Sequence, residues 1–190
     1  ILEELLGDDS DDVRLVAFGM LEAKEKKLSV HIHDEQSHLE KPLSNRARYD
    51  CLRHLAELHW ELTYAGLVQG GLIAHNLNQA WKYIEAALAM DENHECGIWF
   101  LKGRILLAQG SMEPARQALE EAMRMGQSQG SVLPYLSDLA FQKRDFAQVH
   151  AYMRILKPLH VAARTQAIVD FWSGRENVLH FRDRRILQHI

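Results

Sequence analysis

This 190-residue chain has few of the residues that build disulfide frameworks or turn-rich folds: it has two cysteines, four prolines and eleven glycines. Cys51 and Cys96 lie 45 positions apart, without a CxxC spacing. A disulfide framework needs more cysteines than this, so the sequence favours a reducing, intracellular setting. A single disulfide formed in the bacterial periplasm is the alternative that the count leaves open.

The chain also lacks long apolar runs and an excess of positive charge. No run approaches the roughly eighteen residues that cross a bilayer, and no signal peptide opens the sequence. Lys and Arg number 22 against 26 for Asp and Glu, and this net charge of −4 disfavours nucleic acid as a partner. Because the chain begins at Ile1, inside an apolar stretch and without Met, we expect a fragment of a longer protein.

What the chain does have is the apolar fraction of a globular domain, 47%, and a segment that recurs along it. The segment from Trp99 to Ala122 recurs 34 residues later. The matched pairs are Trp99 with Leu133, Gly103 with Ser137, Leu106 with Ala140, Gly110 with Arg144, Ala115 with Val149, Leu119 with Met153, and Ala122 with Leu156. Its second half also occurs 35 residues earlier, as Ala80, Ile84 and Ala87. Three tandem units are therefore predicted.

The stride and the order of residues are similar to the tetratricopeptide repeat. Four positions match that pattern directly, namely Trp99, Gly103, Ala115 and Ala122. Four others depart from it, namely Lys102, Leu106, Leu119 and Gln127. Small side chains allow two helices to approach closely, so we expect a tight helix crossing at Gly103 and Ala115.

The predicted fold class is all-α, a tetratricopeptide-repeat right-handed superhelix with non-repeat N-terminal helices and C-terminal capping helices. We expect an N-terminal helical cap over 1–43, three repeats over 44–157 and capping helices over 158–190. A long first helix should end before Pro42. Its apolar stripe comprises Val13, Val16, Ala17, Met20, Leu21, Leu28, Ile32 and Leu39.

Helix start and stop signals predict the next two helices. Ser44 and Asn45 can cap a helix that continues until Gly70 and Gly71, and the following helix should span about 75–90.

Eleven histidines raise the question of a metal site. His31 and His33 would lie about 200° apart on a helix, and His54 and His59 do not have the HExxH spacing. No phosphate-binding glycine loop or nucleophile signature is present either. The sequence therefore predicts no enzyme, no cofactor and no metal. A helical metal- or ligand-binding domain that uses these N-terminal histidines is the alternative.

Stacked repeat helices form a concave groove that typically binds another protein. The residues expected to face the groove are Phe100, Arg104 and Leu107 in one unit, and Pro134, Asp138 and Phe141 in the next. Core packing of Phe100 and Phe141 explains those two residues equally well. A peptide-binding co-chaperone or regulatory adaptor is an alternative function, although Lys102, Arg104 and Asn93 do not make a convincing carboxylate clamp.

The C-terminal tail carries Arg182, Arg184 and Arg185 beside Asp183. These arginines could bind an anionic partner or an acidic lipid surface, or lie on a solvated helix.

Three segments resemble one bacterial family: Asp11–Lys26, Leu55–Gly70 and Val132–Phe146. Their residues are similar to those of the PelE family of Pel exopolysaccharide biosynthesis. The resemblance implies a tetratricopeptide domain on the cytoplasmic face of the bacterial inner membrane, attached through N-terminal transmembrane helices that precede this sequence. It implies a scaffold without catalytic activity.

The resemblance also implies the partners. They are a PelD-like cyclic-di-GMP receptor, a PelF-like glycosyltransferase and a PelG-like transporter. It supplies no catalytic or binding residue that can be placed on this sequence.

Overall fold

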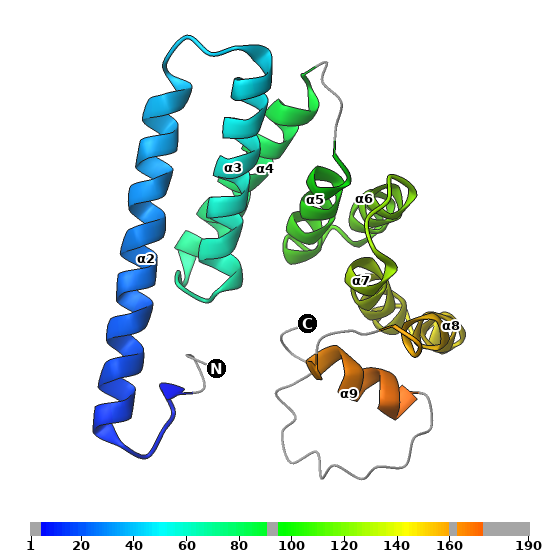
Figure 1. Ribbon diagram of the computed structural model, residues 1–190. Helices are drawn as coiled ribbons and strands as arrows, with labels where there is room; N and C mark the ends of the chain where they lie inside the picture. The colour runs from blue at the N-terminus through cyan, green and yellow to red at the C-terminus, as the bar shows by residue number, and fades with distance from the viewer. Residues whose placement is uncertain (1–4, 91–94, 160–162, 173–190) are drawn as a thin grey trace. The chain divides into compact units, whose positions relative to one another are not determined.

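A computed structural model describes residues 5–90, 95–159 and 163–172, and these ranges contain helices but no strand (Figure 1). The all-α prediction is therefore confirmed. The helices are α2 (Asp11–Leu39), α3 (Asn45–Tyr64), α4 (Gly71–Leu88), α5 (Cys96–Ala108), α6 (Met112–Arg124), α7 (Gln129–Gln142), α8 (Phe146–Leu156) and α9 (Ala163–Trp172). They belong to two compact units, residues 1–94 and 95–190. The division at residues 43 and 157 stays a prediction.

The first unit contains α2, α3 and α4. Asp11 and Asp12 lie in the first turn of α2, where negative charge favours the helix start. The helix ends at Leu39, before Pro42, as predicted. Ser44 caps α3, because its hydroxyl oxygen accepts a hydrogen bond from the Ala47 N–H at 3.2 Å.

The α2 helix packs on α3 mainly through its second half. Ile32 is buried there, and Leu28 and Leu39 pack against the same core, which α3 supplies with Leu55 and Leu58. The predicted apolar stripe is confirmed only in part for the first half: Ala17 is buried, whereas Val16 and Met20 are 62% and 53% exposed. The reason is direction: at about 100° per residue, Val16 and Met20 point about 100° and 60° away from the covered side on which Ala17 lies.

The end of α3 and the start of α4 differ from the predictions. Instead of continuing to Gly70, α3 ends at Tyr64, because Gly66 takes a left-handed conformation at φ +64°. The Leu67 N–H then bonds the Leu62 carbonyl at 3.0 Å, which closes the helix in a Schellman motif. The α4 helix begins at Gly71, four residues earlier than expected.

The second unit contains two helical hairpins, α5 with α6 and α7 with α8, followed by α9. The hairpins bury corresponding residues 34 positions apart: Ala115 and Leu119 in α6 match Val149 and Met153 in α8. At Gly103 the helices α5 and α6 approach so closely that an added Cβ would lie 2.6 Å from the Leu119 Cγ. The predicted close crossing is therefore confirmed at Gly103.

The two hairpins also end their first helices in the same way. Gly110 after α5 has φ +76°, and Arg144 after α7 has φ +59°. In each case the next N–H bonds a carbonyl five residues earlier, from Ser111 to Leu106 and from Asp145 to Ala140, both at 2.9 Å. Arg144 is the one non-glycine residue with positive φ in the described ranges. A shared turn thus recurs at the same 34-residue interval.

Candidate functional site

The predicted groove residues Phe100 and Arg104 lie together in the structure. Both belong to α5, and they contact Tyr135 of α7. The rings of Phe100 and Tyr135 meet edge to face at 5.5 Å. The Arg104 guanidinium lies over both rings, 5.5 Å from the Phe100 centroid and 5.8 Å from that of Tyr135. This cluster joins the first helices of the two hairpins, so Arg104 has a packing role that the sequence does not indicate.

Leu107, Pro134 and Asp138 are partly buried. Leu107 packs against the core of the second unit rather than projecting from it. Pro134 lies inside α7, where it has no N–H to donate. Asp138 accepts a hydrogen bond from the Gln142 side chain at 2.7 Å. Burial raises the pKa of Asp138, although the bond from Gln142 acts in the opposite direction.

Phe141 belongs to a second, more exposed aromatic cluster. Its side chain is 43% exposed and packs against Phe146 of α8 and Trp172 of α9, with ring centroids 5.9 and 6.1 Å away. His150 also contacts Trp172, at 5.1 Å. Phe141 is therefore an accessible residue, and it belongs to a different aromatic cluster from Phe100 and Arg104.

Four exposed apolar side chains of the first unit lie on the first half of α2. Leu15, Val16 and Phe18 are 70%, 62% and 58% exposed. At about 100° per residue, all three point at least about 100° away from the buried Ala17. We call Leu15, Val16, Phe18 and Met20 the α2 apolar surface. Four exposed apolar side chains between residues 15 and 20 are more than the scattered single ones that a protein surface normally carries, so this segment is a candidate interaction site.

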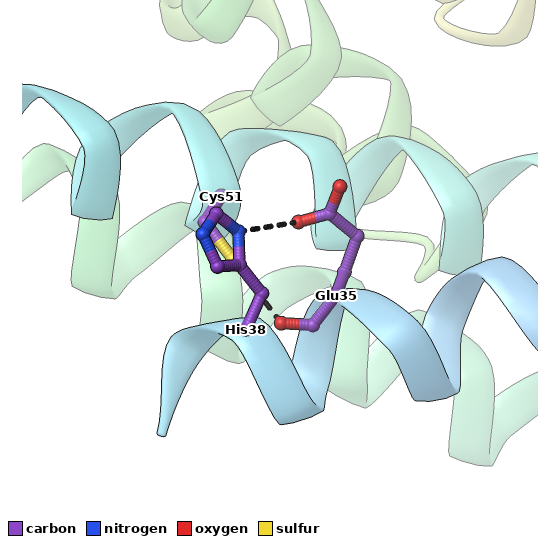
Figure 2. Close-up of side chains that lie close together, drawn as sticks. All are labelled: Glu35, His38 and Cys51. Atoms are coloured by element: carbon purple, nitrogen blue, oxygen red, sulfur yellow. Dashed lines mark hydrogen bonds and ion pairs between the residues drawn. The ribbon is translucent and has the colours of Figure 1, made fainter. Parts of the chain in front are cut away.

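A polar cluster lies between α2 and α3, near the loop that connects them (Figure 2). Glu35 and His38 belong to α2, and Cys51 belongs to α3. The ligand atoms of these three side chains all lie within 4.8 Å of one another, and they form the single group of this kind in the described residues. His54, one turn after Cys51, bonds the Glu35 carboxylate through Nδ1 at 2.8 Å.

The cluster changes the protonation of its members. Burial raises the pKa of the Cys51 thiol to about 12, and the neighbouring Glu35 adds to this effect. Burial also disfavours the charged form of Glu35, but the polar groups of Cys51 and His54 outweigh it and lower the Glu35 pKa. The Cys51 thiol donates its hydrogen bond to the Glu35 main-chain carbonyl at 3.3 Å. Cys51 is therefore a neutral thiol beside the ionised carboxylate of Glu35.

The four histidines singled out in the sequence do not lie together, and His54 alone belongs to the cluster around Glu35. His31 and His33 are exposed on α2, whereas His59 is buried on α3. The His59 Nδ1 lies 2.8 Å from the Asn76 amide oxygen, and its ring stacks on Tyr83 at 5.6 Å. Burial lowers the His59 pKa, the bond to Asn76 acts against this, and the nearby His75 charge lowers it further.

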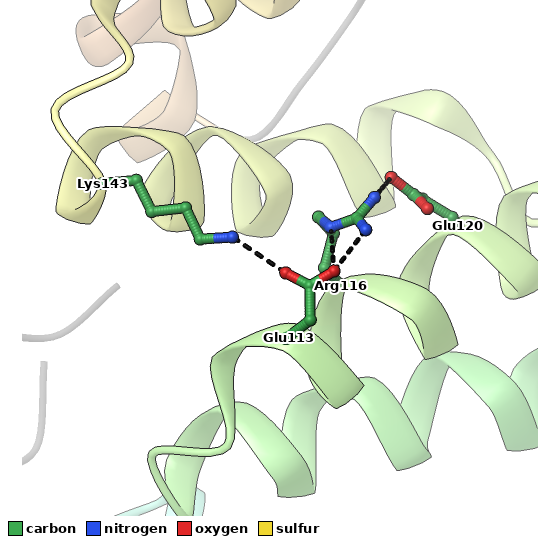
Figure 3. A network of polar contacts seen from close by, with 4 residues as sticks. All are labelled: Glu113, Arg116, Glu120 and Lys143. Carbon is green, nitrogen blue, oxygen red and sulfur yellow. Dashed lines mark hydrogen bonds and ion pairs between the residues drawn. The ribbon is translucent and has the colours of Figure 1, made fainter.

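A surface network of ion pairs joins the two hairpins of the second unit (Figure 3). Glu113 of α6 pairs with Arg116 on its own helix and with Lys143 after α7, the latter at 2.9 Å. Arg116 also bonds Glu120 at 2.6 Å. These hydrogen bonds lower the Glu113 pKa to about 2. Such exposed pairs contribute little to stability.

Comparisons with known proteins leave the family open: no family model matches the chain, and neither the curated proteins nor the solved structures give a match. In the described ranges, no helix has both the length and the apolar character needed to span a membrane. The tail residues Arg182, Arg184 and Arg185, like Asn93, lie outside the described residues.

Sequence reasoning missed Tyr135 and the cluster around Glu35. Tyr135 follows the proposed groove residue Pro134 directly, and only the contact between α5 and α7 reveals its role. The cluster around Glu35 could have been predicted from the sequence, because Glu35-x2-His38 and Cys51-x2-His54 are two i, i+3 pairs on consecutive helices. A search for such pairs, rather than for histidines alone, would have found them.

Proposed function

We propose that this chain is a non-catalytic scaffold that holds other proteins in a membrane-associated complex for Pel-type polysaccharide synthesis and export. Its fold, on this proposal, is a tetratricopeptide-type right-handed superhelix. The recurrence of buried residues and helix ends at 34 residues in α5–α6 and α7–α8 supports that architecture. The resemblance to the PelE family supports the biological setting.

The α2 apolar surface carries the binding part of the proposal. The first half of α2 buries Ala17 but exposes Leu15, Val16 and Phe18. Exposed apolar side chains grouped in this way are unfavourable in water and favour contact with another molecule. Burying one such side chain contributes about 1.5–3 kcal/mol, which offsets part of the roughly 4–15 kcal/mol that association costs. A protein partner is the occupant that this apolar face and the family resemblance favour together.

The proposed partners are a PelD-like receptor, a PelF-like glycosyltransferase and a PelG-like transporter. The proposed location is the cytoplasmic face of the inner membrane. Phe100, Arg104, Leu107, Pro134, Asp138 and Phe141 remain a proposed second contact surface. Because Arg104 packs on two rings, a change at Phe141 disturbs the fold less and is the better probe of this surface.

Co-purification with a separately expressed PelF-like glycosyltransferase tests the proposal. Wild type should retain the enzyme, and a Leu15→Ser, Phe18→Ser double variant should lose it while keeping its helical circular dichroism. Leu72→Ser is the matched control, because Leu72 is 56% exposed on a different helix, α4. Phe141→Ala reports on the second surface. Equal retention by wild type and the double variant would exclude the α2 apolar surface as the contact.

A further inference from the structure

The cluster at the α2–α3 interface has the layout of a metal site built from two helices. Glu35 and His38 are three residues apart on α2, and so are Cys51 and His54 on α3. Residues with this spacing lie side by side on a helix surface. Paired acidic and histidine ligands at the same spacing, on facing helices, hold metals in many helical bundles.

The distances leave room for one ion. Zinc bonds nitrogen and oxygen ligands at about 2.0–2.2 Å and sulfur at about 2.3 Å, so tetrahedral ligands lie about 3.3–3.8 Å apart. Glu35 Oε2 and His38 Nδ1 are already 3.9 Å apart, and no ligand pair in the group exceeds 4.8 Å. Small rotations of the Glu35 and His38 side chains, which are 25% and 51% exposed, close the remaining gap.

We propose that Glu35, His38 and Cys51 bind one divalent transition-metal ion of the zinc class, which joins α2 to α3 (Figure 2). A thiolate, an imidazole and a carboxylate together favour Zn²⁺ over Mg²⁺ or Ca²⁺, which prefer oxygen ligands alone. On binding, the Cys51 S–H bond breaks, a sulfur–metal bond forms, and the proton passes to water. A water molecule from the exposed His38 side fills the fourth position.

His54 acts as a positioning residue for this site. Its Nδ1 contacts Glu35 Oε1, which leaves Oε2 available on the side of His38. Outer partners of this kind orient the metal ligand, and their loss typically weakens metal binding by about 10–100-fold.

A metal at this site would hold α2 against α3, which few other contacts do. In the described part of that helix, Ala17 and Ile32 are the buried residues, so few apolar contacts hold it against α3. The Lys24–Glu61 ion pair at 2.6 Å is exposed and adds little. A metal near the connecting loop would fix the long helix in place. This inference does not depend on the proposed role in assembly.

Cobalt binding to the untagged, metal-free 190-residue chain tests the site. Co²⁺ bound to a thiolate in tetrahedral geometry gives a sulfur-to-metal charge-transfer band in the near ultraviolet and strong visible bands. We expect both bands to saturate at one Co²⁺ per chain and to disappear when Zn²⁺ displaces the cobalt. We also expect Zn²⁺ to raise the thermal midpoint, because a ligand that binds only the folded state stabilises it.

Variants separate this site from adventitious binding. Cys51→Ser should lose the charge-transfer band, and His38→Gln, which changes an exposed side chain and so keeps the fold, should lose saturable binding. His54→Gln should bind more weakly by about 10–100-fold, with unchanged bands. Cys96→Ser and His33→Gln are the matched controls and should behave as wild type. A folded wild type without the bands, or bands that survive Cys51→Ser or His38→Gln, would overturn the assignment.

Discussion

Replacing Gly103 by alanine should destabilise the second unit, although alanine is the better helix former. An alanine Cβ would lie 2.6 and 2.8 Å from two atoms of Leu119 and 3.3 Å from the Ala115 carbonyl oxygen. Leu119 is completely buried, so it cannot move aside without opening the core. Overpacking of this kind costs about 1–3 kcal/mol, and the helix propensity of alanine returns about 1 kcal/mol. Two contacts under 3.0 Å place the cost in the upper part of its range, so we expect a net loss of about 1–2 kcal/mol.

Urea unfolding followed by circular dichroism measures this loss. Gly97→Ala is the matched control, because Gly97 lies on the same helix with no atom within 4 Å of its added Cβ, and it should be neutral or stabilising by up to about 1 kcal/mol. Leu119→Ala alone should cost about 2–5 kcal/mol. In that background Gly103→Ala should become stabilising, because the overlapping atoms are gone. If Gly103→Ala is as stable as Gly97→Ala, the close crossing of α5 and α6 is wrong.

Three further predictions concern stability. Arg144→Gly should raise the free energy of unfolding by about 1 kcal/mol, because Arg144 has φ +59° and glycine adopts that conformation without strain; an unchanged or lower value in urea melts would contradict the shared turn. Ser44→Ala should lower it by about 1 kcal/mol through loss of the α3 cap, whereas Ser29→Ala, at an exposed position inside α2, should cost less; equal losses would refute the capping role. The lowered pKa of His59 means that the unfolded state binds a proton first, so stability should fall as pH drops below about 6.5 and level off beneath the folded-state pKa. His59→Gln should flatten part of that slope, and an identical slope in the variant would show that other groups cause it.

The sequence predicts the second unit well because one physical requirement sets its pattern. Close packing of paired helices needs small or apolar side chains at fixed intervals, and Gly103, Ala115 and Leu119 meet that need in a readable order. The equivalence of Gly110 with Arg144 also follows from the stride. The residue type of Arg144 does not predict a left-handed conformation. Only its alignment with Gly110, 34 residues earlier, suggests it.

The first unit is harder to predict because helix periodicity does not say which side of a broad apolar stripe the neighbouring helix covers. Val16 and Met20 fit the predicted stripe as well as Ala17 and Ile32 do, yet only Ala17 and Ile32 lie on the side that the rest of the unit covers. The α3 helix ends earlier than predicted because Gly66, and not the later Gly70 or Gly71, forms the turn that closes it.

The candidate sites were likewise predictable only in part. Residues on one helix, such as Phe100 and Arg104, could be grouped from their spacing, whereas contacts between helices could not. Tyr135 and the Glu35, His38 and Cys51 group depend on which faces of two helices meet, and that is a property of tertiary packing.

We propose that the α2 apolar surface binds a protein of the Pel-type complex. Isothermal titration of the purified chain with a PelF-like glycosyltransferase, and in parallel with the cytoplasmic part of a PelD-like receptor, measures this binding. We expect saturable binding of at least one of them by wild type and by Leu72→Ser, with binding weakened at least tenfold, or about 1.4 kcal/mol, in the folded Leu15→Ser, Phe18→Ser variant. No binding of either partner by wild type, or equal affinity in the double variant, would show that this surface is not the contact.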